Sequence, residues 1–544
     1  MPGPDAVEGH DPSPILERHY SPPVASLSPV TIAIDAGTTG VRTLVGDERA
    51  QVVDIAYREL TQHYPRPGWV EHDAAEIWGL VRSTLAEVAG RLGDHHRAAL
   101  AIGITNQRET VVAWDRHTGI PLHGAIVWQD RRTAPACRAL ENAGRLPLVR
   151  ERTGLVLDPY FSATKMRWLL HEGEIPNPPD LALATVDSWV LWNLTGGTDH
   201  GVFATDVTNA SRTMVFDIVE RRWSPELCDL FDVPLSALPE ALPSCGHFGL
   251  VSDAAVGADS PLSGVPVSGI AGDQHAALFG QACFDRGMTK VTFGTGSFVL
   301  MNAGTTCPEP VDGLITTLAW DLGAHAVEAT APDAGSSADR HPVAYALEGS
   351  VFASGAGVQW LRDGLGVIGN AAEMEPLARS VASSDGVVVV PAFSGLGSPY
   401  WDPDARGTII GLSRGVGRAH LARAMGEAMS FQVSDVLGAM AGTATAPSVV
   451  RVDGGASVMD LLLQLLADQA RLRVVRPRSV ETTAIGAATM AGLAEGVWGS
   501  LDELAALWSE DTSFGPLVGA PEAAAVHEAW LRAVDRSRHW AGPR

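Results

Sequence analysis

The sequence predicts an α/β protein built from two duplicated domains. Short β-branched runs alternate along the chain with amphipathic stretches at helical spacing, which is the pattern of strands and helices around shared cores. A strand, a glycine-threonine turn and a second strand follow one another twice, in residues 31–45 and 290–301. Two such hairpins in a 544-residue chain indicate a duplication whose two turns face one cleft, with the boundary near Gly280.

This repeat divides the chain into a first domain over residues 29–280 and a second over residues 281–544. Residues 1–28 are rich in Pro, Asp, His and Ser and lack the apolar core of a secretory signal, so we expect a disordered tail. Residues 321–343 have no periodicity and predict a surface loop.

One helix is clearly marked, with Asp73 as its cap and Glu76 three residues later. Its apolar residues fall at helical spacing: Ile77, Leu80, Val81, Leu85, Val88 and Leu92. Two further helices are predicted near residues 421–437 and 458–470.

Composition and charge exclude several classes of function. The 39 basic and 63 acidic residues give a formal charge of −24, which disfavours binding to nucleic acid and to anionic membranes. Five scattered cysteines without a C-x-x-C pair predict neither a disulfide framework nor a zinc site. No apolar run approaches the roughly 18 residues that cross a bilayer. We therefore expect a cytoplasmic protein with reduced thiols and no membrane insertion.

The two hairpin turns are candidate phosphate sites. Neither common glycine-rich phosphate motif occurs, and the only lysines, Lys165 and Lys290, do not lie in a Walker-type loop. The turn from Asp35 to Gly40 offers backbone N–H groups, two hydroxyls and a carboxylate that can hold a magnesium ion through water. The turn from Gly294 to Ser297 offers the same without the acid. Each turn alone could also be an ordinary tight hairpin.

A third candidate element, residues 449–457, ends a β run in a double glycine before a helix. The glycines would let a flat adenine ring approach the backbone closely, although the same pattern also suits a strand-helix packing turn.

Two polar segments predict a substrate site. Arg108 and Glu109 follow the strand that begins at Ile102, where they could bind hydroxyl groups or form a solvated surface pair. Asp273 and Gln274 stand at the carboxyl end of another strand, where ligands of open α/β sheets bind. Asp273 is the candidate catalytic base, and a helix cap is the alternative.

Together the three glycine-containing elements resemble the two phosphate motifs and the adenosine motif of the actin and hexokinase superfamily. This resemblance implies two actin-like (ribonuclease H-like) domains with an ATP cleft between them, and Asp35 near a Mg²⁺ ion. It places the following residues near the nucleotide: Thr38, Thr39, Gly40, Arg42, Thr295, Gly355, Gln359, Gly455 and Met459.

A closer resemblance is to the glycerol kinases of the FGGY carbohydrate kinase family. It runs in order from about Val30 to Trp540 and is carried by seven strings: residues 68–73, 103–110, 125–129, 153–162, 208–213, 269–274 and 399–403. The family relationship implies that ATP phosphorylates glycerol to glycerol 3-phosphate and that the chain forms a homodimer or homotetramer. It also implies the residues that contact glycerol. Its hydroxyls would be bound by Arg108, Glu109, Tyr160, Asp273 and Gln274, and its carbon face by Trp128 and Phe298.

Other functions stay open at this point. The alternatives are a kinase of the same family for another polyol or for a ketose such as xylulose, an actin-like or chaperone-like ATPase, and a catalytically weakened homologue. Three departures from the family pattern bear on them. Residues 258–264 lack the basic loop of some relatives, so inhibition by sugar bisphosphates is not expected. Met459 replaces a usual asparagine, and His275 replaces a frequent glutamine.

Overall fold

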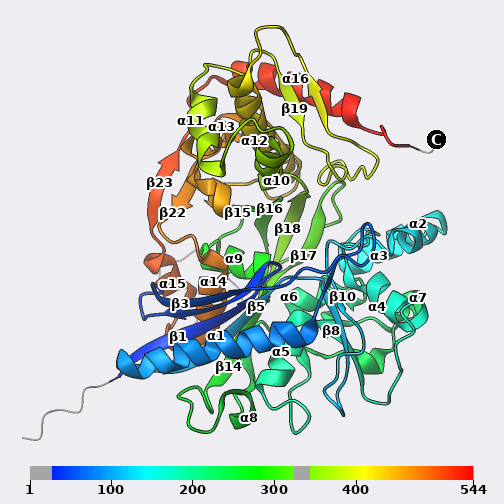
Figure 1. The fold of residues 1–544 in the computed structure, drawn as a ribbon, viewed down its shortest axis with the longest axis vertical. Helices are drawn as coiled ribbons and strands as arrows, with labels where there is room; N and C mark the ends of the chain where they lie inside the picture. The colour runs from blue at the N-terminus through cyan, green and yellow to red at the C-terminus, as the bar shows by residue number, and fades with distance from the viewer. Residues whose placement is uncertain (1–26, 324–342, 543–544) are drawn as a thin grey trace, which may run out of the picture.

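The structure is a computed structural model that describes residues 27–323 and 343–542. It contains two large mixed sheets, one below the other in Figure 1. The six-stranded sheet has the order β13-β14-β5-β1-β2-β3 and the seven-stranded sheet the order β17-β18-β16-β15-β21-β22-β23. The predicted tail lies outside the described residues except for Leu27 and Ser28. Of the predicted loop over residues 321–343, Asp321 ends β17 and Val343 begins β18, and residues 324–342 lie outside the described residues.

The first sheet is formed by these strands: β1 (Ser28–Ala36), β2 (Gly40–Gly46), β3 (Val52–Glu59), β5 (Arg97–Asn106), β13 (Cys245–Leu250) and β14 (Pro266–Gly272). The second is formed by β15 (Met288–Phe293), β16 (Ser297–Gly304), β17 (Ile315–Asp321), β18 (Val343–Val351), β21 (Val449–Asp453), β22 (Val474–Pro477) and β23 (Glu510–Phe514).

The two sheets repeat one pairing pattern. In each, an antiparallel hairpin (β1-β2 or β15-β16) pairs on one side with a further antiparallel strand. On the other side, each hairpin pairs with two parallel strands and then with an antiparallel edge strand. The predicted duplication is therefore confirmed, because six strands of each sheet share one order and direction. Strand β17 is an additional edge strand of the second sheet, next to β18.

Helices cover both sheets. Helix α1 (Ala74–Asp94) begins after Asp73, whose Oδ1 accepts the backbone N–H of Ala75 at 2.8 Å. It buries the predicted apolar stripe except for Leu80, which is only partly buried. The second sheet carries α10 (Gly355–Gln359), α11 (Met374–Arg379), α12 (Arg418–Ala441), α13 (Asp460–Ala470) and α16 (Ala520–Ser537). The predicted helix at 458–470 starts two residues late, because a 3₁₀ turn occupies Gly455–Val458.

A smaller four-stranded sheet extends the first lobe. It consists of β4 (Glu71–His72), β7 (Ala125–Ile126), β6 (Val111–Asp115) and β8 (Leu181–Thr185). Around it lie α2 (Ala134–Asn142), α3 (Leu146–Thr153), α4 (Ser162–His171), α5 (Val186–Leu194), α6 (Val207–Ala210) and α7 (Pro225–Phe231). Short elements complete the fold: α8 (Asp253–Val256), β9 (Ala204–Asp206), β10 (Phe216–Asp217), β11 (Arg222–Trp223), β12 (Glu240–Leu242), β19 (Val388–Val390) and β20 (Thr408–Ile410).

Two helices join the lobes at the centre. Helix α9 (Asp273–Gly280) leads from β14 to β15, and α14 (Thr482–Ala494) follows β22 but packs on strands β1, β5 and β14 of the other sheet. Glycines permit this close approach, since a Cβ at Gly486 would lie 1.9 Å from the carbonyl oxygen of Ala276 on α9. Helix α15 (Leu501–Leu507) then returns the chain to β23.

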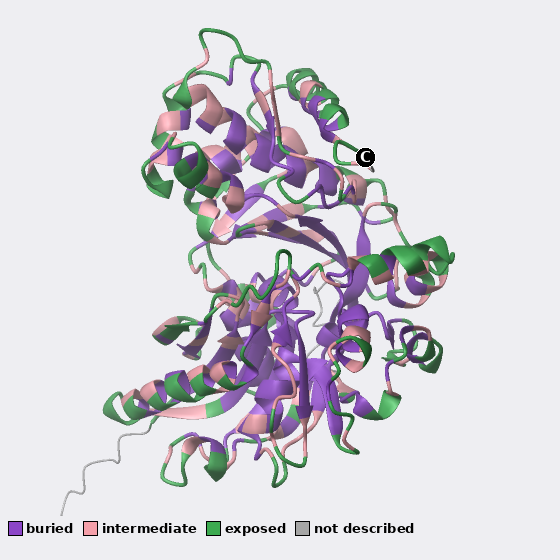
Figure 2. Cartoon of the chain, turned by 45° about the vertical axis from the view of Figure 1, so that its right-hand side comes forward, coloured by how far each residue is buried: buried purple, intermediate pink, exposed green. Residues whose placement is uncertain are grey.

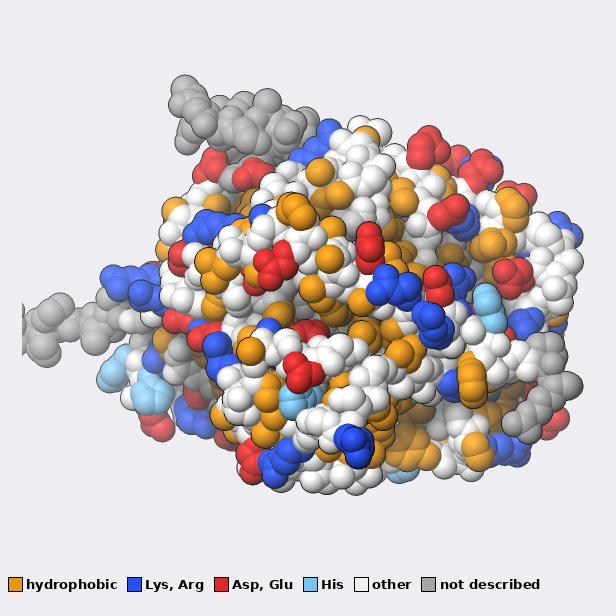
Figure 3. All heavy atoms as spheres, turned by 90° about the horizontal axis from the view of Figure 1, so that it is seen from above, with side chains coloured by type: hydrophobic (Ala, Val, Ile, Leu, Met, Phe, Trp, Pro, Cys, Tyr) orange, Lys and Arg blue, Asp and Glu red, His pale blue; other side chains and the backbone are white. Residues whose placement is uncertain are grey.

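Burial is concentrated in the strands and in these central helices, whereas the outer helices are exposed along one side (Figure 2). Seen from above, acidic and basic side chains are interspersed with apolar ones over the surface (Figure 3). None of the helices in residues 27–323 and 343–542 is both long and apolar enough to cross a membrane.

Candidate active site

The first hairpin places Asp35 and Arg42 opposite each other on β1 and β2. The Arg42 guanidinium forms an ion pair with Glu481, which precedes α14. Burial raises the pKa of Asp35 to about 7; Arg42 opposes this rise, while the carboxylates of Asp273 and Glu481 add to it. Asp35 and Asp273, which are far apart in the sequence, therefore lie within electrostatic reach of each other.

The turn after Asp35 is held by the partly buried side chains of Gln62 and Trp128. The carbonyl oxygen of Thr38 accepts a hydrogen bond from Gln62 Nε2 at 2.6 Å, and its hydroxyl accepts one from Trp128 Nε1 at 3.0 Å. Behind the turn, His72 lies between two glutamines. Its Nε2 is 2.9 Å from Gln62 Oε1, and its Nδ1 is 3.1 Å from Gln107 Nε2. Burial lowers the pKa of His72 to about 4, so this ring is neutral at pH 7. The turn is thus fixed by neutral hydrogen bonds before any ligand arrives.

Asp273 lies at the carboxyl end of β14, as the sequence predicts. It is the first residue of α9, and Gly272 occupies the cap position. Its Oδ1 accepts the N–H of Gln274 at 2.7 Å and lies 3.2 Å from Arg108 Nε. Its Oδ2 has no hydrogen-bond partner among the described residues. The Asp273 side chain is 29% exposed whereas that of Arg108 is 1% exposed, so one carboxylate oxygen is available to a ligand.

Arg108 and Glu109 are buried rather than paired at the surface, which excludes the alternative of a solvated pair. Arg108 donates two hydrogen bonds to Glu348, at 2.7 and 3.1 Å, and Arg212 donates to Glu109 at 2.7 Å and to Glu348 at 2.9 Å. Burial disfavours ionisation of Glu348, but Arg108 and Arg212 outweigh it and hold its pKa well below the usual range. Two guanidinium groups and two carboxylates thus neutralise each other beside Asp273.

Aromatic rings line the same region. The ring centroid of Trp128 lies 5.6 Å from that of Tyr160 and 6.1 Å from that of Phe298. The Tyr160 hydroxyl accepts a hydrogen bond from Arg108 at 3.2 Å, and the Arg108 guanidinium lies 6.0 Å from the centre of the Phe298 ring. These rings supply apolar surfaces beside the polar and charged groups, a combination that suits a compact polyhydroxylated ligand.

Gln274 is oriented by a buried lysine from the second lobe. Lys290 on β15 donates to Gln274 Oε1 and, at 2.9 Å, to the Thr292 hydroxyl. Burial lowers the pKa of Lys290 to about 8. His275 lies in the first turn of α9, as predicted, with Nε2 3.3 Å from the Thr317 hydroxyl.

A separate cavity of about 830 Å³ lies beside the second hairpin turn. Five of the predicted nucleotide residues line it: Thr295, Gly355, Gln359, Gly455 and Met459. Asp460, which follows Met459, pairs with Arg476 at 2.8 Å and does not line this cavity. The remaining nucleotide predictions, Thr38, Thr39, Gly40 and Arg42, lie on the first hairpin, outside this cavity.

Sequence reasoning missed Glu348, Arg212 and Lys290 as parts of the site. Glu348 is a single acid within the apolar strand β18, and Lys290 is one of only two lysines. An ionisable residue inside an apolar strand is rarely buried without a partner, so both were detectable signals.

Two sheets that share a six-strand pattern, with polar residues converging between them, define a two-lobed α/β fold of the kinase type. Residues 30–280 match the N-terminal domain of the FGGY family of carbohydrate kinases, and residues 289–495 match its C-terminal domain. The chain belongs to this family.

Its relatives include glycerol kinases. Those of Burkholderia multivorans and Dechloromonas aromatica are each 48% identical to this chain, over 94% of its length and 98% of theirs. Among solved structures, Plasmodium falciparum glycerol kinase with ADP is similar with a TM-score of 0.83 and 33% identity, covering 94% of this chain and 98% of that one. A ligand-bound xylulose kinase from Lactobacillus acidophilus has a TM-score of 0.79 at 19% identity, covering 93% and 97%, and shares the fold.

Proposed function

We propose that this protein transfers the γ-phosphoryl group of ATP to glycerol and forms sn-glycerol 3-phosphate. The carrying observation is that Arg108 lies within hydrogen-bonding distance of both Asp273 and Tyr160, while Asp273 lies within electrostatic reach of Asp35. The glycerol kinases at 48% identity and the ADP complex of the Plasmodium enzyme support the choice of substrates.

Glycerol binding follows from the chemistry of the walls. In this proposal, the three hydroxyl groups of glycerol meet donors and acceptors from Arg108, Glu109, Tyr160 and Gln274. The carbon chain is covered by Trp128 and Phe298. Because the Arg108 and Glu109 charges are neutralised by Glu348 and Arg212, these residues are fixed in position before substrate binds.

Asp273 is the proposed general base. Oδ1 is held by Arg108 and by the N–H of Gln274, so Oδ2 is left to accept the proton of a terminal glycerol hydroxyl. The hydroxyl oxygen attacks the γ-phosphorus, the bond between that phosphorus and the β–γ bridging oxygen breaks, and ADP leaves with its electron pair.

The residues also fit a Mg²⁺ ion. Asp35 is the carboxylate on the phosphate turn, and it lies within electrostatic reach of the Asp273 carboxylate. This small donor set suits magnesium, which binds through one or two carboxylates, waters and substrate phosphates. Asp35 would hold the ion, which neutralises charge on the phosphates when bound. The Thr38–Gly40 and Thr295 turns are proposed to hold the phosphates, and the cavity lined by Gly455 and Met459 is proposed to hold adenine.

The test is an ATP-coupled assay across glycerol, other polyols and ketoses including xylulose. We expect glycerol to give the highest kcat/KM and ATP turnover to be negligible without an acceptor. Faster phosphorylation of xylulose than of glycerol would mean that xylulose is the substrate. Hydrolysis of ATP without any acceptor would indicate an ATPase. The contacts of Arg108 with Glu109 and Tyr160 support a glycerol site rather than a xylulose kinase or an ATPase. The proposal includes the cytoplasmic location and the homodimer or homotetramer that the family resemblance implies.

A further inference from the structure

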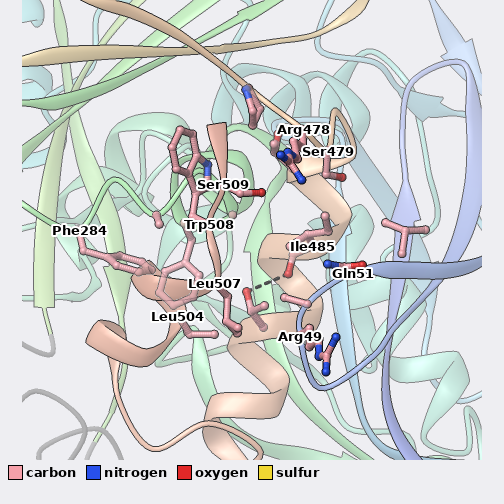
Figure 4. A pocket seen from close by; sticks show the side chains of 18 residues that line it. Arg49, Gln51, Phe284, Arg478, Ser479, Ile485, Leu504, Leu507, Trp508 and Ser509 are labelled. Carbon is pink, nitrogen blue, oxygen red and sulfur yellow. Dashed lines mark hydrogen bonds between the residues drawn. The ribbon is translucent and has the colours of Figure 1, made fainter. Parts of the chain in front are cut away.

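A second cavity, of about 390 Å³, lies where the two lobes join (Figure 4). It shares no lining residue with the 830 Å³ cavity proposed to hold adenine, which is called the nucleotide cavity below. Three connections between the sheets contribute to its walls. They are the end of α9 before β15 (Gly280, Ala282), the segment between β22 and α14 (Arg478, Ser479), and the segment between α15 and β23 (Trp508, Ser509). The turn between β2 and β3 closes the remaining side. Any movement of one lobe relative to the other must pass through these connections.

The cavity has an apolar interior and a basic rim. Phe279, Ile485, Leu504 and Leu507 form apolar walls, with Phe279 and Leu504 buried. Polar side chains stand at the other side, among them Gln51, Ser479 and Ser509 (Figure 4).

Two rim side chains are unpaired. Arg49 and Arg478 form no side-chain hydrogen bond or ion pair with any residue in the described parts of the chain. Both side chains are exposed, so their charges are open to a ligand. Two free guanidinium groups at the mouth of an apolar cavity suit an anion that carries an apolar group.

Hydrogen bonds connect this cavity to the nucleotide site. Thr482, a lining residue, donates to Asp453 Oδ2 at 2.6 Å. Trp508, another lining residue, donates to Gln281 Oε1 at 3.2 Å, and Gln281 Nε2 donates to the same Asp453 oxygen at 2.8 Å. Asp453 immediately precedes the Gly454-Gly455 turn, and Gly455 lines the nucleotide cavity. Two walls of the interlobe cavity therefore meet at the carboxylate of Asp453, the residue that precedes the Gly454-Gly455 turn.

We propose that this cavity is a regulatory site for a small organic anion with an apolar group of about the size of one aromatic ring. A bound anion contacts all three connections, so it favours one relative position of the lobes and changes the affinity for nucleotide. The binding part of this inference is independent of the proposed function, whereas the coupling part rests on nucleotide binding.

The test uses phenyl phosphate as the ligand and isothermal titration calorimetry on the full chain. Glycerol and a non-hydrolysable ATP analogue are kept saturating so that the candidate active site is filled. We expect saturable binding of phenyl phosphate, with at least about tenfold weaker binding of inorganic phosphate and of phenol. The double variant Arg49→Ala/Arg478→Ala and the variant Gln51→Glu, which places a negative charge at the rim, should each weaken binding at least about tenfold.

Arg138→Ala is the matched control, because Arg138 is an exposed arginine on α2 outside the cavity. It should bind phenyl phosphate as the unaltered protein does. Coupling is measured by titrating the ATP analogue with and without phenyl phosphate, and we expect its affinity to change at least about fivefold.

Absence of saturable binding, or equal binding by the rim variants, would overturn the site. Binding without a change in nucleotide affinity would overturn the regulatory role. Phosphorylation of glycerol without phenyl phosphate is measured in parallel for all variants. A failure of the proposed function would appear as missing activity in every sample, whereas a failure of this inference would leave the activity intact.

Discussion

Glu348 accepts two hydrogen bonds from Arg108, at 2.7 and 3.1 Å, although the residues belong to opposite lobes. Glu348 lies on β18 of the seven-stranded sheet, and Arg108 follows β5 of the six-stranded sheet. Both side chains are almost completely buried, so the pair is shielded from water and salt. The second lobe therefore orients Arg108, a residue of the first lobe that we propose binds substrate.

Replacing Glu348 by Gln removes one of the two buried negative charges that balance Arg108 and Arg212. We expect the free energy of unfolding to fall by about 3 kcal/mol, because breaking a buried pair leaves a charge uncompensated. KM for glycerol should rise at least about tenfold, with a smaller change in kcat. Urea unfolding and steady-state kinetics measure both effects, with the exposed Glu226→Gln as control. An unchanged KM would mean that Glu348 has a structural role only.

Asp273→Asn tests the proposed base. We expect glycerol binding to persist, because Arg108 remains held by Glu348, while kcat falls by about 10² to 10⁴. Calorimetric titration of glycerol and single-turnover measurements separate binding from chemistry. Near-native kcat in this variant would remove Asp273 from the catalytic role.

Lys290 predicts a pH dependence of glycerol binding. Its pKa is lowered to about 8 by burial, so its charge is present below that pH and is lost as the pH rises through it. The donor to Gln274 then weakens, and KM for glycerol should increase between pH 7 and pH 9.5. In Lys290→Met, KM should be about tenfold higher at pH 7 and should lose this increase. A variant with the same pH profile as the unaltered protein would contradict the assignment.

Met459 lines the cavity proposed for adenine, where most glycerol kinases carry an asparagine according to the family resemblance. A thioether cannot form the directed hydrogen bonds of an amide, and one lost hydrogen bond costs about 0.5 to 1.5 kcal/mol. Met459→Asn should therefore lower KM for ATP several-fold and increase the preference for ATP over GTP. If neither KM for ATP nor the preference for ATP over GTP changes, the hypothesis that Met459 removes an adenine contact is wrong.

Lobe closure is a further expectation. Asp273 belongs to the first lobe, whereas Thr295 and Gly455 lie on the second. ATP analogue and glycerol together should draw them closer and exclude water from the transferred group. Small-angle scattering should then give a smaller radius of gyration with both ligands than with either alone. Identical values at saturation would count against closure.

Local sequence was sufficient for the hairpins, for the capped helix after Asp73 and for the position of Asp273 at a strand end. Each depends on neighbouring residues: alternation defines a strand, glycine permits the turn, and a side-chain oxygen caps the first helical N–H groups. The resemblance carried by short strings then connected these elements to a kinase family.

The sequence could not decide whether Arg108 and Glu109 form a surface pair or a buried site, because burial depends on what packs over them. The structure covers them with Glu348 and Arg212, and Glu348 lies 240 residues from Arg108. The sequence likewise could not predict that Lys290 contacts Gln274, or that Arg49 and Arg478 line the same cavity. Charges interact through distance in space, and only the packing of the two sheets and of helix α14 between them sets those distances.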